Sequence, residues 1–259
     1  MSTYTQRAIP GPKFSRAQQC GMQTWTPPHR IAAYALAASW AVTLPERCGC
    51  SVRFVADGMI RAIVMGHRIP AGALGPEPVQ LDVRAYLVAH ASGVILVDTG
   101  MDAGGLALDA ALGEASAAWP DVSHVLITHA HRDHVGALDH VRQAAPAAAV
   151  MASAVEGLPG LSPLADRDVI GPLRVFASPG HTPGHLSFAD EERGVLLVGD
   201  CVGVVGGRLV RAPERFTADL EVAEQTLRSL LAWRGARMLF AHGPELASPW
   251  DELDTLLER

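Results

Sequence analysis

Residues 128–136 read Thr-His-Ala-His-Arg-Asp-His-Val-Gly, so three histidines and one aspartate fall within six positions. The stretch directly follows the apolar run Val125-Leu126-Ile127. Neutral imidazole and carboxylate are the ligands that zinc and similar divalent cations select, and a site needs several of them converging from a rigid support. The stretch therefore predicts a metal site at the end of a buried strand.

The spacing within this stretch indicates two adjacent metals. If residues 125–128 form a strand, an extended turn after it directs His129 and His131 to the same side, where they share one cation. A helix that begins near Asp133 directs Asp133 and His134 toward a neighbouring point. We therefore expect the first pair to hold one metal and the second pair to hold another.

Three later segments each end an apolar run with a residue that binds metal well. His181 lies in residues 179–184, where two Pro-Gly pairs favour a tight turn that presents a side chain inward. Asp200 ends the apolar residues 194–199, and its two oxygens are suited to bridging two cations. His242 follows the apolar end of residues 237–241. These residues supply the ligands that the first stretch lacks.

In this order the motifs resemble the signature of the metallo-β-lactamase-fold superfamily, His-x-His-x-Asp-His followed by a His, an Asp and a His. All seven positions match, and the resemblance covers roughly residues 52 to 250. It implies two Zn²⁺ ions, with iron or manganese as alternatives. It further implies that one metal is held by His129, His131 and His181. The other metal would be held by Asp133, His134 and His242, and Asp200 would bridge the two.

Several residues near these ligands receive supporting roles in our interpretation. Asp98, in residues 94–100, resembles the family's strand-ending Asp-Thr-Gly and is expected to orient a ligand histidine by a hydrogen bond. His185 is expected to support the ligands or to pack, because the motif assigns the metal to His181. Cys201 is expected to be buried as a small apolar residue, since its side chain points away from that of its neighbour Asp200. The remaining histidines are interpreted as surface or hydrogen-bonded core residues: His29, His67, His90, His124 and His140.

Apolar periodicity predicts the order of the elements. A helix after Asp133 would bury Val135, Leu138 and Val141. The order suggests an α/β fold with the layers of an αββα sandwich and the ligands on loops at one edge of the sheets. Strands are expected at residues 52–55, 60–65, 79–89, 94–97, 125–128, 148–151, 173–177, 186–189, 194–198 and 238–241, and further helices at 104–112, 218–231 and 248–259.

Composition agrees with a soluble enzyme, and the alternating strand and helix signals favour a single α/β domain. The chain has 259 residues, of which 49% are apolar, and a formal charge of −6 without any run of Lys or Arg. An extended surface that follows nucleic-acid phosphates is therefore not expected. The four cysteines have neither paired CxxC spacing nor the density of a disulfide scaffold. Reduced thiols, and with them a cytoplasmic location, are the expectation.

Residues 1–50 form an N-terminal extension of uncertain structure, whereas residues 51–259 form the metallo-β-lactamase-like domain in our interpretation. The apolar run 31–44 is 14 residues long, short of the roughly 20 that span a bilayer, so no membrane association is expected. Three explanations of the extension stay open. It is the core of a secretion signal, a start assigned upstream of the true one, or a helix packed on the domain.

The ligand set indicates hydrolysis. Two cations about 3.5–4 Å apart lower the pKa of a bridging water to about 7, which produces a hydroxide nucleophile at neutral pH. The metal held by the three histidines would polarise the carbonyl that is attacked, and Asp133 would act as a catalytic residue by taking the proton. Because the chain has no Gly-x-Ser-x-Gly elbow, a covalent acyl-enzyme is disfavoured.

Differences between this chain and three subfamilies of the superfamily narrow the choice of substrate. β-Lactam-hydrolysing members typically replace ligands that this chain keeps, and glyoxalase II-like members carry a long helical region after the core, where only 17 residues follow His242 here. Acyl-homoserine lactonases typically have a Tyr shortly after the bridging Asp, which residues 201–210 lack. We therefore predict hydrolysis of an ester- or lactone-type carbonyl of a small molecule. A persulfide dioxygenase-like enzyme with one iron and a β-lactam hydrolase are the alternatives, and a homodimer stays open.

Overall fold

The computed structural model describes residues 41–42, 52–57, 60–69, 71–72 and 76–259. The predicted extension, residues 1–50, lies outside the described residues apart from the two-residue strand β1 (Ala41–Val42). The division of the chain at residue 50 therefore stays a prediction, as do the three explanations of the extension and the interpretation of His29.

Alternating side chains of strand β3 (Ile60–Ile69) decide how the layers stack. Ile63 and Met65 belong to one apolar cluster, whereas Ile60 and Val64 belong to another. Successive side chains of a strand point to opposite faces of its sheet. The strand is therefore buried on both faces, which explains why its sequence is apolar without strict alternation.

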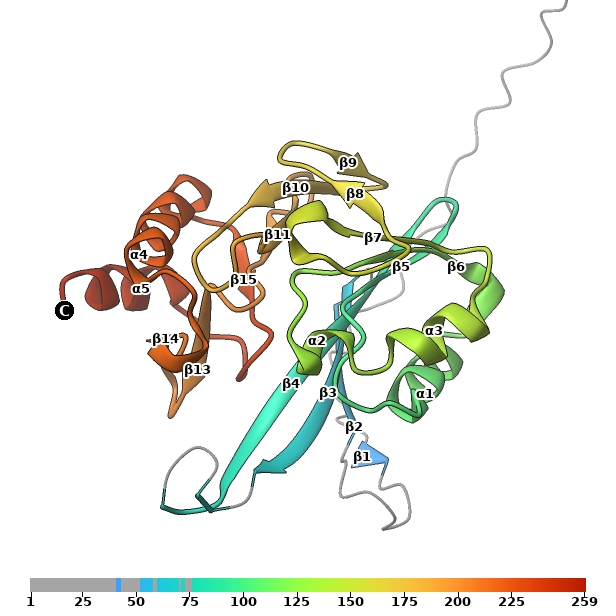
Figure 1. Cartoon of the computed structure of the whole chain (residues 1–259), viewed down its shortest axis with the longest axis horizontal. Coiled ribbons are helices and arrows are strands. Elements are labelled where there is room, and N and C mark those ends of the chain that lie inside the picture. Colours follow the sequence, from blue (N-terminus) through green and yellow to red (C-terminus); the bar gives the residue numbers. More distant parts are fainter. Residues whose placement is uncertain (1–40, 43–51, 58–59, 70, 73–75) are drawn as a thin grey trace, which may run out of the picture. The chain divides into compact units, whose positions relative to one another are not determined.

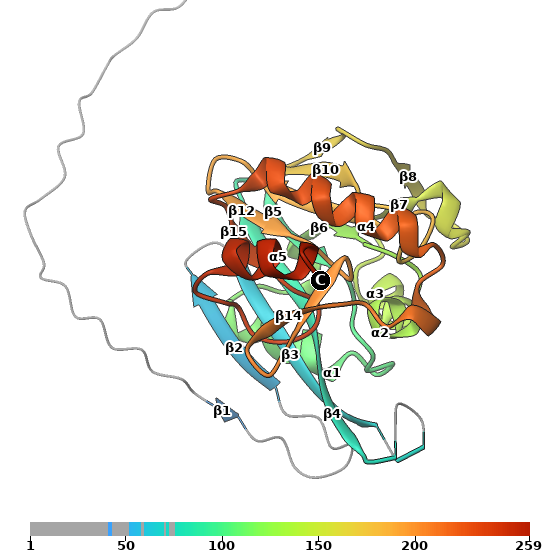
Figure 2. The same ribbon diagram turned by 90° about the vertical axis from the view of Figure 1, so that its left-hand side faces the viewer.

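Three apolar clusters separate four layers of secondary structure. The first cluster joins the first sheet to helices α1 (Leu106–Glu114) and α3 (Leu138–Ala144). The second lies between the two sheets, and the third joins the second sheet to helices α4 (Leu220–Ser229) and α5 (Pro249–Leu257). Figure 1 shows the two helix pairs on opposite sides of the sheets, and Figure 2 shows α4 and α5 from their own side. The predicted αββα sandwich is confirmed.

The first sheet follows the order of the chain, from β1 to β8. Its strands up to β5 are antiparallel, and those from β5 onward are parallel. Parallel strands end at the same edge, so the loops after β5 and β6 lie close together. The bounds are β2 (Val52–Asp57), β4 (Val79–His90), β5 (Gly93–Val97), β6 (Val122–Leu126), β7 (Ala149–Ser153) and β8 (Ser162–Leu164).

The second sheet has the order β15-β12-β11-β10-β9, and its β12 and β15 are parallel. A separate hairpin pairs β13 (Val202–Val205) with β14 (Arg208–Arg211), and the sequence analysis assigned neither strand. The bounds are β9 (Val169–Ile170), β10 (Leu173–Ala177), β11 (Leu186–Asp190), β12 (Val195–Leu197) and β15 (Arg237–Leu239). Short 3₁₀ turns are η1 (Trp119–Asp121), η2 (Ala154–Glu156), η3 (Glu214–Phe216) and η4 (Leu230–Trp233).

The single helix predicted after Asp133 is wrong. The chain forms two helices there, α2 (Arg132–Val135) and α3, which are separated at Gly136. Gly136 N–H donates to the Gly100 carbonyl at 2.8 Å, and a Cβ on Gly136 would lie 2.7 Å from that oxygen. The close approach of the residue 98–101 loop therefore interrupts the helix. Leu138 and Val141 are buried as expected, and Val135 is partly buried.

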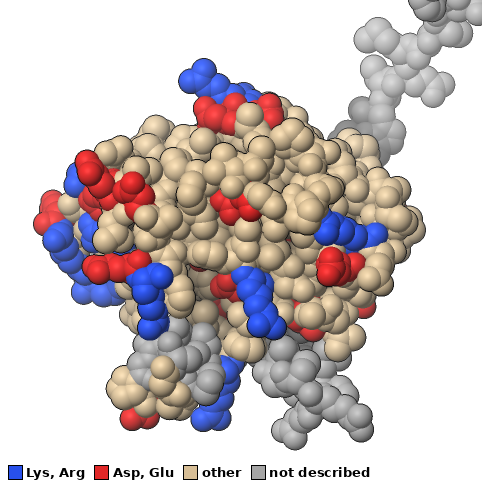
Figure 3. All heavy atoms as spheres, in the orientation of Figure 1, with Lys and Arg blue, Asp and Glu red and all other residues tan. Residues whose placement is uncertain are grey.

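One face of the molecule shows how charged side chains are distributed. On the face shown in Figure 3, basic and acidic side chains lie interspersed among uncharged ones. Of the helices in the described part of the chain, none is both long and apolar enough to cross a bilayer. The expectation that the chain binds no nucleic acid stays a prediction.

Phe188, fully buried between the two sheets, tests this layering. Phe188→Ala leaves a cavity that the sheets cannot close, so we expect it to lower the free energy of unfolding by about 3–5 kcal/mol in urea titrations. Val169→Ala, at a position 57% exposed, should change that free energy by no more than about 0.5 kcal/mol. Equal effects of the two substitutions would contradict the layering.

Candidate metal centre

The seven candidate ligands lie at the ends of strands from both sheets. His129, His131, Asp133 and His134 follow β6 in the loop and the short helix α2. The others come from the second sheet. His181 lies between β10 and β11, Asp200 follows β12, and His242 follows β15. Rigid strands of both sheets therefore support the loops that carry the candidate ligands.

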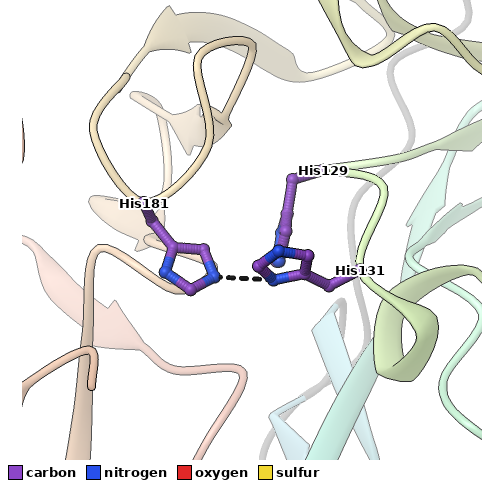
Figure 4. A group of neighbouring side chains, drawn as sticks. All are labelled: His129, His131 and His181. Atoms are coloured by element: carbon purple, nitrogen blue, oxygen red, sulfur yellow. Dashed lines mark hydrogen bonds between the residues drawn. The ribbon is translucent and has the colours of Figure 1, made fainter. Parts of the chain in front are cut away.

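His129, His131 and His181 form the first group (Figure 4), with ligand atoms within 4.8 Å of one another. The Nε2 atom of His181 lies 2.9 Å from Nδ1 of His131. His129 and His181 are buried, whereas His131 is half-buried. This is the three-histidine set expected to hold the first metal.

Asp133, His134, Asp200 and His242 form the second group, again with ligand atoms within 4.8 Å of one another. Asp200 contacts both groups. Its Oδ2 lies 3.4 Å from Nε2 of His181 and 3.3 Å from Nε2 of His242, and its Oδ1 lies 3.2 Å from Nε2 of His134. The structure thus brings all seven predicted ligands together, and Asp200 has the position expected of a bridging carboxylate.

Several polar atoms of these groups are buried without a hydrogen bond from any described residue. They include His129 Nε2 and His181 Nδ1. A buried polar atom without a partner costs about 1–3 kcal/mol. Atoms of this type are also the ones that bind borderline divalent cations. The donor set therefore fits a pair of metal ions.

The electrostatics of the second group also favour a cation. Burial raises the pKa of Asp200, but the charges of His242 and His134 outweigh it and hold the pKa well below its ordinary value. Burial lowers the pKa of His242, but the Asp200 charge and hydrogen bonds to Asp133 and Asp200 outweigh it and raise the pKa to about 10. Likewise, Asp200 and Asp98 overcome burial and raise the pKa of His134 well above its ordinary value. The buried, ionised carboxylates are therefore stabilised by nearby positive charge, which a divalent cation supplies.

Hydrogen bonds to the Nδ1 atoms orient three of the histidines. His134 Nδ1 donates to Asp98 Oδ2 at 2.7 Å, which is the contact expected of Asp98. The Thr128 hydroxyl donates to Asp98 at 2.8 Å and lies 3.1 Å from His129 Nδ1, from which it can accept. His242 Nδ1 donates to the carbonyl of Asp82 at 3.0 Å. Each bond holds one ring nitrogen and leaves Nε2 facing the groups, as is usual for metal-binding histidines.

Glu156 is a supporting residue that the sequence analysis missed. Its Oε2 accepts from the Ala130 N–H at 2.7 Å, and its Oε1 accepts from the Thr182 hydroxyl at 2.6 Å and the Gly184 N–H at 2.9 Å. The carboxylate thus joins the loop that carries His129 to the loop that carries His181. Its partners lie 26 to 28 residues away in the chain, so no local pattern marks it.

His185 and Cys201 lie beside the groups but in neither. His185 Nε2 accepts from the Asp200 N–H at 3.0 Å, and its Nδ1 lies 2.8 Å from the Ser178 hydroxyl. Burial lowers the pKa of His185 to about 3, so the ring is neutral. Cys201 is buried, as expected, and burial raises its pKa to about 11. Other histidines make ordinary polar contacts: His90 and His124 with Ser123, and His140 with Asp109.

Comparison with known proteins gives one family and several partial likenesses. The family model described as the metallo-beta-lactamase superfamily matches residues 79–168 and 164–242. The uncharacterized protein YobT of Bacillus subtilis (strain 168) is 28% identical over 217 residues, which are 70% of this chain and 92% of that protein. The two segments matched by the family model contain all seven candidate ligands.

Two further likenesses concern proteins with a stated activity or metal. A hydroxyacylglutathione hydrolase of Ectopseudomonas mendocina (strain ymp) is 35% identical over 133 residues, or 49% of each chain, so this chain matches about half the length of that enzyme. The solved structure of TTHA1623 in a di-iron-bound form is 26% identical, with a TM-score of 0.55, and covers 69% of this chain and 92% of that one.

Glu156→Ala tests the link between the two loops. The substitution removes the acceptor of three hydrogen bonds, so we expect the affinity for zinc to fall about 10–100-fold, as it does when partners of metal ligands are lost. Competition with a chromophoric chelator measures this affinity. Glu191→Ala, which removes an exposed carboxylate paired with Arg174, is the matched control and should leave the affinity unchanged. Equal affinities of the two variants would contradict the role of Glu156.

Proposed function

Because the chain belongs to the metallo-beta-lactamase superfamily, we propose that its two ligand groups bind two divalent cations and hydrolyse an ester- or lactone-type carbonyl of a small molecule. The observation that carries this proposal is the position of Asp200, within 3.4 Å of imidazoles from both groups. A single buried carboxylate between two sets of imidazoles is suited to two adjacent cations. We propose zinc as the metal.

The chain's own residues have distinct tasks in this reaction. Two cations in such a site, when bound, polarise the carbonyl and lower the pKa of water to about 7. Asp133 is the proposed proton acceptor, because its side chain is 20% exposed whereas that of Asp200 is 9% exposed. Burial raises the pKa of Asp133, but the hydrogen bond to His242 and the charge of His134 outweigh it and lower the pKa. Asp133 is therefore ionised at neutral pH and able to take a proton.

A thioester carbonyl is the second candidate substrate, and the hydroxyacylglutathione hydrolase relative supports it. Iron is the alternative metal, because TTHA1623 was solved in a di-iron-bound form. We further propose a cytoplasmic location, on the composition of the chain and on the buried free thiol of Cys201.

Metal removal and reconstitution test the proposal. Dialysis against a chelator should lower ester and lactone hydrolysis at least about 100-fold, because the carbonyl and the water both depend on the cations. Two equivalents of zinc should restore the activity. Elemental analysis should find about two metals per chain. About one iron per chain, with oxygen uptake and no ester turnover, would support the dioxygenase alternative instead.

His131→Ala tests the first ligand group separately. The variant removes one of the three histidines, so we expect kcat/KM for a small ester to fall at least about 100-fold, with less zinc bound per chain. His124→Ala, also a half-buried histidine but outside both groups, is the control and should keep the zinc content and the activity. Unchanged turnover in a panel of esters, lactones and thioesters would refute the assignment of His131.

A further inference from the structure

A cavity of about 220 Å³ opens directly beside the candidate metal centre. Asp200 and His181 line it, and both belong to the ligand groups. Helix α4 contributes Leu220, Ala223 and Leu227 to the lining, and Ala212, just after the hairpin β13–β14, also lines it. The lining therefore joins two candidate ligands to segments that are distant in sequence from the first metal stretch.

The hydroxyl groups that line the cavity are engaged within the protein. The Thr226 hydroxyl donates to the Pro179 carbonyl at 2.5 Å, and the Thr217 hydroxyl donates to the Pro213 carbonyl at 3.1 Å. The Ser178 hydroxyl lies 2.8 Å from Nδ1 of His185. These walls therefore present mainly apolar surface to a ligand.

Charges along the cavity disfavour an anion. Arg211 lines the cavity, but its Nε and Nη2 lie 3.0 and 2.9 Å from Glu224, so its charge is already paired. Glu214 adds a negative charge to the lining. An anionic group inside the cavity would meet like charge without a free cation among the described lining residues.

The size and the entrance of the cavity limit what fits. An apolar cavity of about 150 Å³ holds benzene, whereas sites for drug-sized ligands have about 300–1,000 Å³. At about 220 Å³ this cavity accepts a group somewhat larger than benzene. Leu220 on its lining is 51% exposed, and Phe216 in the adjacent turn η3 is 46% exposed. Two large exposed apolar side chains beside an apolar cavity are typical of a ligand entrance.

We propose that this cavity binds the acyl group of the substrate, and that this group is neutral, apolar and about six to eight carbon atoms in size, such as hexanoyl or phenylacetyl. The inference rests on the proposed hydrolase function, because it places the reacting carbonyl beside Asp200. A long fatty acyl chain exceeds the cavity, and a dicarboxylic acyl group meets the charge of Glu214.

Esters with a constant leaving group and a variable acyl group test the inference in the zinc-loaded protein. p-Nitrophenyl hexanoate should be preferred over the acetate by up to about fourfold in kcat/KM per added methylene. The hexadecanoate and the hydrogen adipate ester should both be poorer substrates than the hexanoate. Ala212→Phe fills the cavity and should lower the hexanoate-to-acetate ratio of kcat/KM at least about tenfold.

Ala147→Phe is the matched control, because it adds the same side chain at an exposed position away from the cavity. It should keep the acyl preference of the unsubstituted protein, and thermal melting should show that both variants are folded. If Ala212→Phe lowered the acetate and the hexanoate ester by the same factor, the cavity would not hold the acyl group and the inference would be overturned. A preference for the adipate ester would overturn it as well.

Binding of hexanamide, a neutral molecule that carries the same acyl group, gives a readout that does not need turnover. Calorimetry should show binding to the zinc-loaded protein that Ala212→Phe weakens at least about tenfold. If no ester, lactone or thioester were hydrolysed but hexanamide bound in this way, the hydrolase proposal would fail and the cavity assignment would stand. If esters were hydrolysed without any acyl preference and hexanamide did not bind, only the cavity assignment would fail.

Discussion

The buried carboxylate of Asp200 is the constraint on which the rest of the site depends. Four histidines come within 3.9 Å of it, and they arrive from the β6 loop, from the loop between β10 and β11, and from the segment after β15. An ionised carboxylate that is 9% exposed needs compensating positive charge. Protonated imidazoles or divalent cations supply that charge. The loops at the ends of both sheets must therefore bring their histidines close to Asp200 for its buried charge to be compensated.

The supporting hydrogen bonds make this meeting point rigid. Asp98 directly follows the strand β5 and accepts hydrogen bonds from both Thr128 and His134, so it couples the two neighbouring parallel strands of the first sheet. Glu156 performs the equivalent task between the sheets, since it holds the backbone at Ala130 and at Gly184. A metal site loses affinity when its ligands can move. The two carboxylates outside the ligand groups thus hold the loops that carry the candidate ligands.

The site and its cavity have different origins in the chain. The candidate ligands belong to strand ends of the two central sheets, whereas the cavity walls come largely from residues 211–227, between β14 and the end of α4. This division means that the proposed acyl group contacts a segment that carries none of the candidate ligands. It also explains why likeness to other members of the superfamily supports a reaction type more strongly than a substrate.

The sequence alone determined which residues are the candidate ligands, because they follow short apolar runs, and this pattern can be recognised within a few residues of the chain. It also determined the layer order, through the apolar strands and the amphipathic helices that follow them. Only the tertiary structure decided that Gly136 breaks the helix after Asp133, because the loop at Gly100 packs against it from a distance in sequence. The same holds for Glu156 and for the cavity beside Ala212, since contacts between remote segments leave no periodic signal in the chain.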